Sequence, residues 1–322
     1  MIITKTPFRV SFAGGGTDIR DYYQNGYGAV LSIAINKYMY ITVNRRFEDS
    51  IRVSYSRTEI VDDVEELRHE LVRECLKLTG ISKGIEITSI ADVPSGTGLG
   101  SSSCFTVGLL NALFTYTGNN LSAEELADLA CRIEIDILKH PIGKQDQYAC
   151  ACGGVNYFRF CSDETVEREK ISFDEFSMRD LNRKFMLFYT GMRRNANEVL
   201  KDQRRRTPAG IEVLDKIRDQ ADRLRDDFKA NGFTEDIARV LHEGWVMKSS
   251  LSDKISNSEL DRMYQTALSA GAKGGKILGA GGGGFLLVYC DEPDQDAVRE
   301  ALGLKEMEVR ISEYGSRVVY FG

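Results

Sequence analysis

Apolar and polar residues alternate along the first part of the chain, a pattern typical of half-buried β-strands. Phe8, Val10 and Phe12 alternate with Arg9 and Ser11. The other segments with alternating, β-branched or aromatic character are 38–45, 51–55, 85–90 and 153–160. The amino-terminal half is therefore expected to be built on a sheet.

Helical periodicity lies between these strands. Apolar residues at helical spacing predict helices over 65–78, 102–116 and 123–139. The third helix is expected to begin at a capping box, because Ser122 is followed three residues later by Glu125.

The carboxyl-terminal half mixes helices with buried strands. The expected helices are 210–229, 235–251 and 257–270, the last capped by Asn257, and the expected strands are 184–191, 284–290, 305–311 and 316–321. The polar segment 161–182 is typical of a linker or peripheral excursion. The sequence thus predicts an α+β protein of two lobes, 1–165 and 166–322.

Composition excludes several classes of protein. The 322 residues include 42 Lys+Arg and 48 Asp+Glu, so the formal net charge of -6 gives no basic footprint for nucleic acid. No apolar run approaches the roughly 20 residues of a membrane span, and the first residues lack the apolar core of a signal peptide. Seven scattered cysteines and three separated histidines disfavour disulfides and a histidine-built metal site. We expect a cytoplasmic protein, and the sequence leaves open whether it forms a homo-oligomer.

Glycine is the exception to this ordinary composition, because half of the 30 glycines fall in four short stretches. The strongest is Pro94–Ser103, PSGTGLGSSS, between an expected strand and an expected helix. Glycines can turn backbone N–H groups inward, and the helix end adds partial positive charge, so this stretch suits phosphate. Its serines can cap the helix, contact phosphate or hold Mg²⁺. A plain turn with serine capping would need fewer glycines and serines.

The stretch Gly279–Gly284 formally satisfies the dinucleotide-binding pattern GxGxxG. That pattern opens a helix in dinucleotide-binding proteins, whereas here an expected strand follows, so this reading is rejected. A flexible hairpin loop is one alternative. Close approach of a ligand to the backbone is the favoured one.

Three acidic residues are candidates for chemistry. Asp18 ends the glycine turn Gly14–Asp18. Two interpretations stay open: Asp18 and Thr17 contact a polyhydroxylated ligand, or the segment is a simple turn. Asp146 precedes an apolar, small-residue stretch that implies burial, so it is a functional candidate rather than a solvated charge. For Glu134 the residues alone favour a solvated charge over a metal ligand.

In this order, the stretches resemble the three motifs of the GHMP kinases, here Pro7-Phe-Arg9 with its glycine turn, Pro94–Ser102 and Gly279–Gly284. The resemblance implies a ribosomal protein S5 domain 2-like first lobe and a ferredoxin-like second lobe, with the site between them. It also implies ATP and Mg²⁺ as cofactors. The nucleotide-binding residues it implies are Pro94, Gly96, Thr97, Gly98, Leu99, Gly100, Ser101, Ser102 and Ser103.

The same resemblance implies roles for single residues. Asp146 matches the proposed catalytic base and Arg9 the basic residue of the first motif, where mevalonate kinases use lysine. Ser102 and Glu134 match metal ligands. The implied substrate contacts are Gly16, Thr17, Asp18, Asp146, Arg193, Gly281 and Gly282.

Within the family, the glycine turn and the segment GKQDQYA at 143–149 are similar to kinases that phosphorylate the anomeric hydroxyl of a heptose 7-phosphate. The expected partner is therefore a small-molecule sugar phosphate, whose phosphate needs a cation such as Arg193 or Arg194. The arginine run 204–206 is more typical of a solvated face. An L-fucokinase-like or other anomeric kinase stays open. So does a silent sugar or nucleotide sensor, although a sensor needs no catalytic base.

Overall fold

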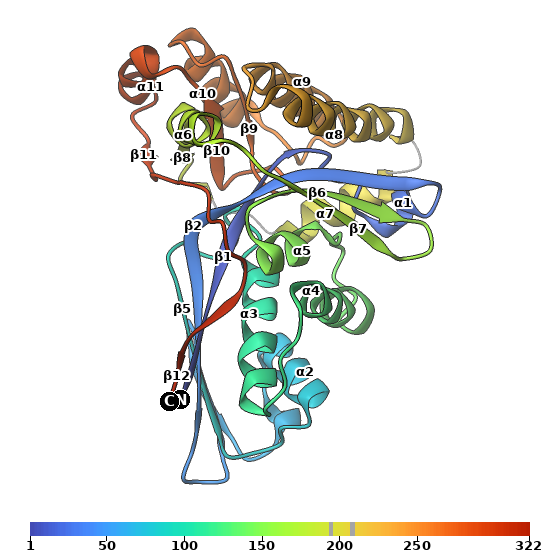
Figure 1. The fold of residues 1–322 in the computed structure, drawn as a ribbon, viewed down its shortest axis with the longest axis vertical. Coiled ribbons are helices and arrows are strands. Elements are labelled where there is room, and N and C mark those ends of the chain that lie inside the picture. The colour runs from blue at the N-terminus through green and yellow to red at the C-terminus, as the bar shows by residue number, and fades with distance from the viewer. Residues whose placement is uncertain (193–195, 207–209) are drawn as a thin grey trace.

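Two long antiparallel strands, β1 (Ile2–Ala13) and β2 (Tyr27–Arg45), form the spine of the first lobe (Figure 1). We describe them from a computed structural model, which covers residues 1–192, 196–206 and 210–322. Burial alternates along 39–43, as the pattern of polar and apolar residues predicts. The first half of β2 is buried on both faces, so it shows no alternation and was not predicted.

The first sheet contains eight strands in the order β12-β1-β2-β5-β3-β4, and β6 and β7 extend it from the first half of β2. Its other strands are β3 (Ile51–Ser54), β4 (Thr58–Val61), β5 (Ile85–Ala91), β6 (Val155–Cys161), β7 (Val166–Ile171) and β12 (Arg317–Phe321). All the strands expected in the amino-terminal half are therefore confirmed.

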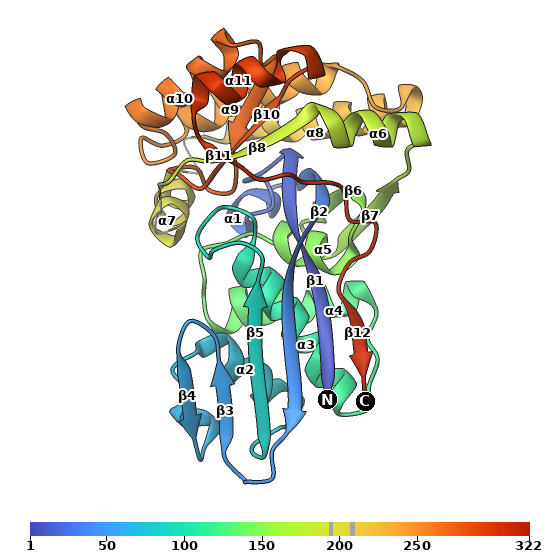
Figure 2. The ribbon, with the colours of Figure 1, turned by 90° about the vertical axis from the view of Figure 1, so that its left-hand side faces the viewer.

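Helices cover one face of this sheet, and Figure 2 shows the opposite face with the strands in front. The helices of the first lobe are α1 (Arg20–Tyr23), α2 (Glu70–Thr79), α3 (Ser101–Tyr116), α4 (Ala123–Cys131) and α5 (Gln145–Cys152). The predicted capping box of α4 is confirmed, since Ser122 Oγ accepts from the Glu125 backbone and Glu125 accepts from the Ser122 backbone. A short 3₁₀ turn (Val64–Glu66) precedes α2, and a π-helical turn (Arg132–Ile137) follows α4.

The second lobe has a four-stranded antiparallel sheet in the order β11-β8-β10-β9. Its strands are β8 (Phe185–Tyr189), β9 (Gly274–Ile277), β10 (Phe285–Tyr289) and β11 (Lys305–Glu306). Its helices are α6 (Glu175–Lys184), α7 (Ala196–Arg206), α8 (Ile211–Asn231), α9 (Asp236–Ser250), α10 (Ser258–Ser269) and α11 (Gln295–Leu302). If β8, β9, β10 and β11 are numbered 1 to 4 along the chain, their order in the sheet is 4-1-3-2. With helices connecting the strands, this sheet order is ferredoxin-like. The α+β, two-lobed fold is confirmed.

Two expected segments differ in the structure. The segment 161–182 is no linker, because β7 pairs with β6 and most of α6 follows. Charged residues fill β7 because it is an edge strand with one exposed face. The strand expected over 305–311 ends at Glu306. The chain then returns to the first lobe as β12, and the division at 165/166 stays a prediction.

Apolar and polar contacts fix the two lobes to each other. Phe12 at the end of β1 stacks on Phe185 of β8 with ring centroids 5.0 Å apart. Tyr22 and Tyr27 donate hydrogen bonds to Asp215 and Asp222 of α8, at 2.6 Å and 2.7 Å. These contacts join the first lobe to β8 and α8 of the second lobe.

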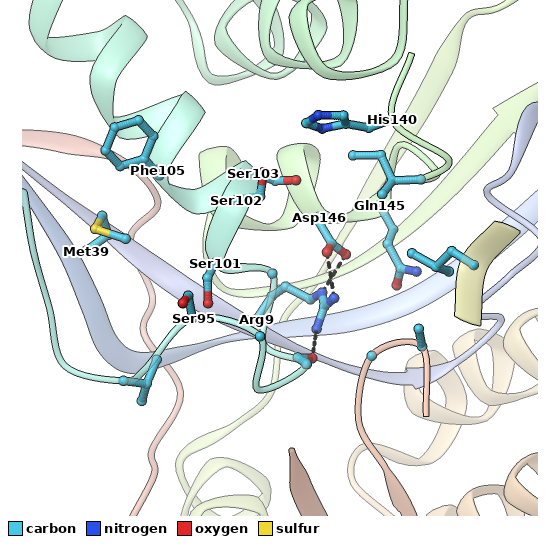
Figure 3. Close-up of a pocket in the computed structure, with 18 of the residues that line it drawn as sticks. Arg9, Met39, Ser95, Ser101, Ser102, Ser103, Phe105, His140, Gln145 and Asp146 are labelled. Carbon is cyan, nitrogen blue, oxygen red and sulfur yellow. Dashed lines mark hydrogen bonds and ion pairs between the residues drawn. The ribbon is translucent and has the colours of Figure 1, made fainter. Parts of the chain in front are cut away.

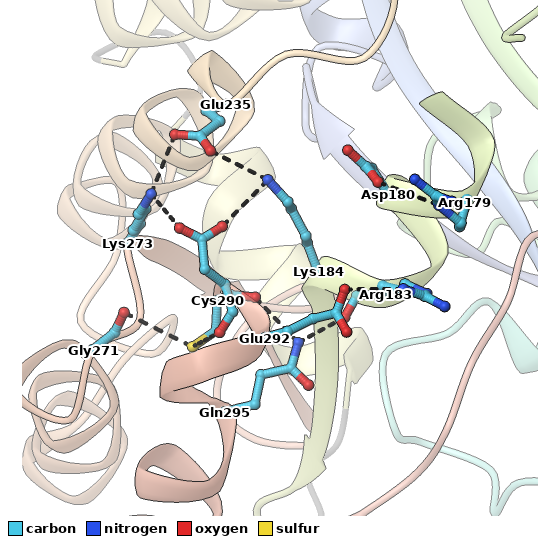
Figure 4. Close-up of polar contacts among 11 residues, drawn as sticks. Arg179, Asp180, Arg183, Lys184, Glu235, Gly271, Lys273, Cys290, Glu292 and Gln295 are labelled. Carbon is cyan, nitrogen blue, oxygen red and sulfur yellow. Dashed lines mark hydrogen bonds and ion pairs between the residues drawn. The ribbon is translucent and has the colours of Figure 1, made fainter. Parts of the chain in front are cut away.

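A group of oppositely charged side chains lies in the second lobe (Figure 4). Lys184 and Lys273 each pair with both Glu235 and Asp291, so four segments of the chain are tied together. These residues do not line the cleft described below, and we assign them a structural role. Within the described ranges, no helix is both long and apolar enough to cross a membrane.

Candidate active site

A cleft of about 660 Å³ lies between the lobes, and the predicted phosphate loop forms its middle (Figure 3). One end is lined by apolar and aromatic side chains, among them Met39, Tyr55 and Phe105. The other end is polar and includes Asp18 and side chains of both lobes. The cleft thus offers an apolar pocket, an anion loop and a polar pocket in a row, an arrangement suited to a nucleotide and a polar acceptor.

The phosphate loop depends on glycine for its shape. Gly96, Gly98 and Gly100 have φ of 76°, 85° and 80°, a region that other residues rarely adopt. Leu99 between them is fully buried and anchors the loop in the core. Ser101 Oγ at the start of α3 is buried without a hydrogen-bond partner among the described residues. A buried hydroxyl of this kind favours a ligand that supplies the missing bond.

Arg9 and Asp146 form the charged centre of the cleft. Arg9 donates from Nε and Nη2 to the two Asp146 oxygens, both at 2.6 Å, and from Nη1 to the Gly98 carbonyl at 2.7 Å. Burial lowers the pKa of Arg9, but the Asp146 carboxylate outweighs this effect and the pKa is raised. The side chain of Asp146, in the first turn of α5, is 23% exposed. The predicted burial of Asp146 is only partial, because its carboxylate pairs with Arg9 and reaches the cleft.

Asp18 lies beside this centre and is only 2% exposed. It accepts hydrogen bonds from the Gly16 backbone at 3.0 Å and from the backbone and side chain of Gln145 at 3.2 Å and 3.1 Å. Burial, reinforced by the Asp146 carboxylate, raises the pKa of Asp18. Thr17 points elsewhere, because its hydroxyl lies within hydrogen-bond distance of the Gly14 and Ala29 carbonyls, at 2.8 Å and 2.9 Å, and fixes the turn. Of the predicted substrate contacts in this turn, Gly16 and Asp18 line the cleft.

Glu134 is fully buried, so its reading as a solvated charge is wrong. Ser102 donates to one carboxylate oxygen, and Gln147 Nε2 donates to the other at 2.7 Å. Glu134 lies in the π-helical turn and points inward, while Ile137 at the end of this turn is 43% exposed. Glu134 lies four residues after Ala130, which is buried in α4, and this spacing was the signal for burial.

Ser102 and Glu134 offer oxygen ligands of the kind that Mg²⁺ binds. A hydroxyl and a single carboxylate are hard oxygen ligands, the kind with which Mg²⁺ is bound alongside substrate phosphates. The described residues contain no group of three His, Cys, Asp or Glu that could hold a metal by themselves. The residues present fit Mg²⁺ if phosphate oxygens complete its coordination.

Glu134→Gln is expected to separate stability from activity. Burial raises the pKa of Glu134 above 4.5, so the native state holds this proton more tightly than the unfolded chain. The free energy of unfolding therefore falls as the pH rises from 4.5 through the raised pKa. We expect the uncharged variant to unfold at a higher temperature than the parent near pH 8, with a smaller difference near pH 5, and to lose turnover. Thermal unfolding at both pH values measures this, and a pH-independent difference would contradict it.

The carboxyl-terminal glycine turn packs directly on the phosphate loop. A β-carbon on Gly284 would lie 2.3 Å from the Thr97 carbonyl oxygen, so no larger residue fits there. Gly279 and Ala280 line the cleft. Gly281 and Gly282 instead pack against Ile255, and their assignment to the substrate stays a prediction. The turn leads into β10, in agreement with rejection of the dinucleotide reading.

The predicted cation sites are only partly described. Arg193 and Arg194 lie outside the described residues. In the run 204–206, the Arg205 side chain is 77% exposed and pairs with Asp202 at 3.0 Å, as expected for a solvated face.

The seven cysteines are free, and burial raises the pKa of Cys75, Cys131 and Cys150 well above its usual value.

Several cleft residues were missed by sequence reasoning. At the apolar end, His69 stacks on Phe105 with ring centroids 4.9 Å apart and meets Tyr55 edge-on at 4.7 Å. Burial lowers the pKa of His69, and its buried Nδ1 has no partner among the described residues, so a neutral ring is offered to a ligand. Lys248 and Gln145 at the polar end were also missed. His69 and Lys248 lie in no motif, whereas Gln145 lies inside the segment 143–149, where sequence reasoning gave it no role.

Comparison with known proteins matches the chain to two family models. Residues 66–154 match the GHMP kinases N terminal domain, and residues 224–308 match GHMP kinases C terminal. The chain is 30% identical over 308 residues to the D-glycero-alpha-D-manno-heptose 7-phosphate kinase of Campylobacter jejuni, with 90% of this chain and 89% of the relative covered. It is 26% identical to the galactokinase of Pyrococcus furiosus, with 97% and 95% covered.

A solved structure agrees over the whole length. The crystal structure of a D-glycero-D-manno-heptose 1-phosphate kinase from Bacteroides thetaiotaomicron is similar with a TM-score of 0.83 at 25% identity, and 100% of both chains is covered.

Proposed function

The chain belongs to the GHMP kinase family, and on that basis we propose that it transfers the γ-phosphate of ATP to the anomeric C1 hydroxyl of D-glycero-D-manno-heptose 7-phosphate. The product is the 1,7-bisphosphate, used to make nucleotide-activated heptose. The observation that carries the proposal is the Arg9–Asp146 pair, placed between the phosphate loop and the polar end of the cleft. The printed names of the Campylobacter and Bacteroides relatives support a heptose phosphate as substrate.

ATP would lie along the phosphate loop with its base in the apolar end. The base would meet Phe105, Tyr55 and the neutral ring of His69, groups suited to stacking against a flat heterocycle. The inward N–H groups of the loop and the start of α3 would hold the phosphates. Ser102 and Glu134 would hold Mg²⁺, which when bound offsets the negative charge of the phosphate oxygens.

The reaction needs positioning and charge stabilisation more than covalent chemistry. Asp146 would accept the proton of the anomeric hydroxyl as that oxygen bonds to the γ-phosphorus and the bond to the ADP oxygen breaks. Arg9 holds the Asp146 carboxylate by two hydrogen bonds and the phosphate loop by a third. It would therefore fix the distance between Asp146 and the transferred phosphate. Asp18 and Gln145 would bind sugar hydroxyls beside this centre.

A panel of acceptors tests the proposal. ADP release is measured with heptose 7-phosphate, heptose 1-phosphate, L-fucose, mannose and galactose, and phosphorus NMR gives the position of the new phosphate. We expect the highest kcat/KM for heptose 7-phosphate and a new phosphorus signal from a phosphate on the anomeric oxygen. A preference for a free sugar would instead indicate an L-fucokinase-like or other anomeric kinase, and no ADP release with any acceptor would indicate a sensor.

A further inference from the structure

Three aromatic rings from separate segments of the chain line the apolar end of the cleft. Tyr55 lies in the connection between β3 and β4, His69 precedes α2, and Phe105 belongs to α3. The His69 ring stacks on Phe105 at an interplanar angle of 25° and meets Tyr55 edge-on at 88°. A wall assembled from three segments keeps its shape only if contacts behind the rings hold the segments together.

The carboxylate of Glu59, on β4, makes such contacts. Its Oε1 accepts one hydrogen bond from the Tyr55 hydroxyl at 2.8 Å and another from the His69 backbone N–H at 3.2 Å. Its Oε2 accepts a third from the Arg68 backbone N–H at 2.7 Å. Glu59 lies outside the set of described residues that line the cleft. Two of the three rings are thus tied to each other through a single oxygen atom behind them.

Both of the tied segments depend on an anchor of this kind. β4 is an edge strand of the first sheet, so the β3–β4 connection that carries Tyr55 is supported by the sheet from one side. His69 is the N-cap residue of α2, and the described contacts include no capping hydrogen bond from its own side chain. The N–H groups at the start of this helix are instead satisfied by a carboxylate from another element.

Glu59 is ionised in this arrangement. Burial raises its pKa, but the hydrogen bonds from the Arg68 N–H, the Tyr55 hydroxyl and the His69 N–H outweigh burial, so the pKa is lowered from its usual value. An ionised carboxylate accepts hydrogen bonds on both oxygens, and such bonds are stronger than those between neutral groups. A glutamine would keep one accepting oxygen and would turn its NH₂ group toward an N–H that needs an acceptor.

We propose that Glu59 is a positioning residue for the nucleotide base: it holds Tyr55 and His69 at the separation that lets a flat heterocycle pack against the aromatic wall. The inference rests on the proposed function, in which the base lies at this end of the cleft. The rings contact the base, and Glu59 acts through them. Its contribution is therefore expected in the affinity for the base and not in the affinity for the phosphates, which the phosphate loop binds.

Calorimetry with two ligands separates these affinities. The full chain is titrated in the presence of Mg²⁺ with ATP and with inorganic tripolyphosphate, which carries the phosphates without a base. Glu59→Gln is expected to raise Kd for ATP by about 3- to 10-fold, the worth of one aromatic contact, and to leave Kd for tripolyphosphate within about twofold. Glu66→Gln, at an exposed glutamate of the turn before α2, is the matched control and should bind both ligands like the parent.

Tyr55→Phe gives an independent measurement, because it keeps the ring and removes only the hydroxyl that Glu59 holds. It should also weaken ATP and spare tripolyphosphate. Adding it to Glu59→Gln should bring little further loss, since both changes remove the same hydrogen bond. In steady-state kinetics KM for ATP should rise in each variant, while kcat and KM for the acceptor stay within about twofold of the parent.

Two kinds of result would overturn the inference. One is an affinity for ATP that is unchanged in Glu59→Gln, or unchanged in Tyr55→Phe if Glu59→Gln does not fold. The other is an equal loss for ATP and tripolyphosphate, or a parallel fall in kcat, because a general loss of structure affects every ligand. If the ATP affinities change as expected but heptose 7-phosphate is not phosphorylated, the inference stands and only the proposed acceptor is wrong.

Discussion

Asp146→Asn is expected to lower kcat by about 10²- to 10⁴-fold, the range that a positioned general base contributes. The amide cannot take the proton of the acceptor hydroxyl, and it offers Arg9 one oxygen in place of two. The phosphate loop and the aromatic end of the cleft are left in place, so the affinity for ATP is expected to stay within about threefold of the parent. Steady-state kinetics and an ATP titration measure the two quantities separately.

A matched change at the surface controls for the loss of a carboxylate. Asp49 is 80% exposed and pairs across the surface with Lys83, so Asp49→Asn should keep full turnover. Circular dichroism checks that Asp146→Asn is folded. Turnover within about tenfold of the parent in a folded Asp146→Asn would remove Asp146 from the role of base.

The second large effect is expected for Arg9→Met, with a loss of about 10²- to 10³-fold in kcat/KM. Arg9 is 4% exposed and makes two hydrogen bonds to Asp146 and one to the Gly98 carbonyl, and each bond to a charged group is worth about 1.5–3 kcal/mol. Without the guanidinium, Asp146 and the phosphate loop are no longer held at a fixed distance from each other. The loss is therefore expected in kcat as well as in KM for the acceptor.

Arg9→Lys distinguishes geometry from charge. Lysine keeps the positive charge but lacks the fork that reaches Asp146 and Gly98 together, so only part of the activity should return. Arg52→Met, which removes a 41% exposed arginine paired with Glu86, serves as the control and should be close to the parent. Full activity in Arg9→Lys would show that charge alone matters at this position.

Local features of the fold were predictable because their signal lies within a few residues. The Ser122–Glu125 capping box and the cap at Asn257 are side-chain bonds to the adjacent helix, and both are confirmed. Features that depend on distant partners were missed. The first half of β2 is buried between β1, β6 and the helices, and β7 is an edge strand whose charged residues hide its alternation.

The candidate site divides in the same way. The glycine loop was visible because each left-handed glycine is a local requirement. The contact of Arg9 with Asp146 joins residues 137 positions apart, and only a family resemblance suggested it. Lys248 comes from the second lobe and His69 from the end of a loop, and neither lies in a motif. Glu134 was misjudged because its charge suggested exposure, although it lies four residues after the buried Ala130 of α4.

The return of β12 to the first sheet restricts how the cleft can open. Two chain segments, 172–174 and 307–316, join the lobes. The second is held on β2 because the Asn36 N–H donates to the Arg310 carbonyl, the Arg310 N–H donates to the Asn36 side chain, and the Ser312 N–H donates to the Ala34 carbonyl. A body attached at two points rotates most easily about the line through them. Rotation of one lobe about any other axis is opposed, so this one rotation sets the distance between the phosphate loop and Lys248. A single protease cut in 307–316 would leave the lobes covalently joined through 172–174, whereas a cut in 172–174 would leave the body of the first lobe attached to the second lobe only by non-covalent contacts, among them the pairing of β12 with β1.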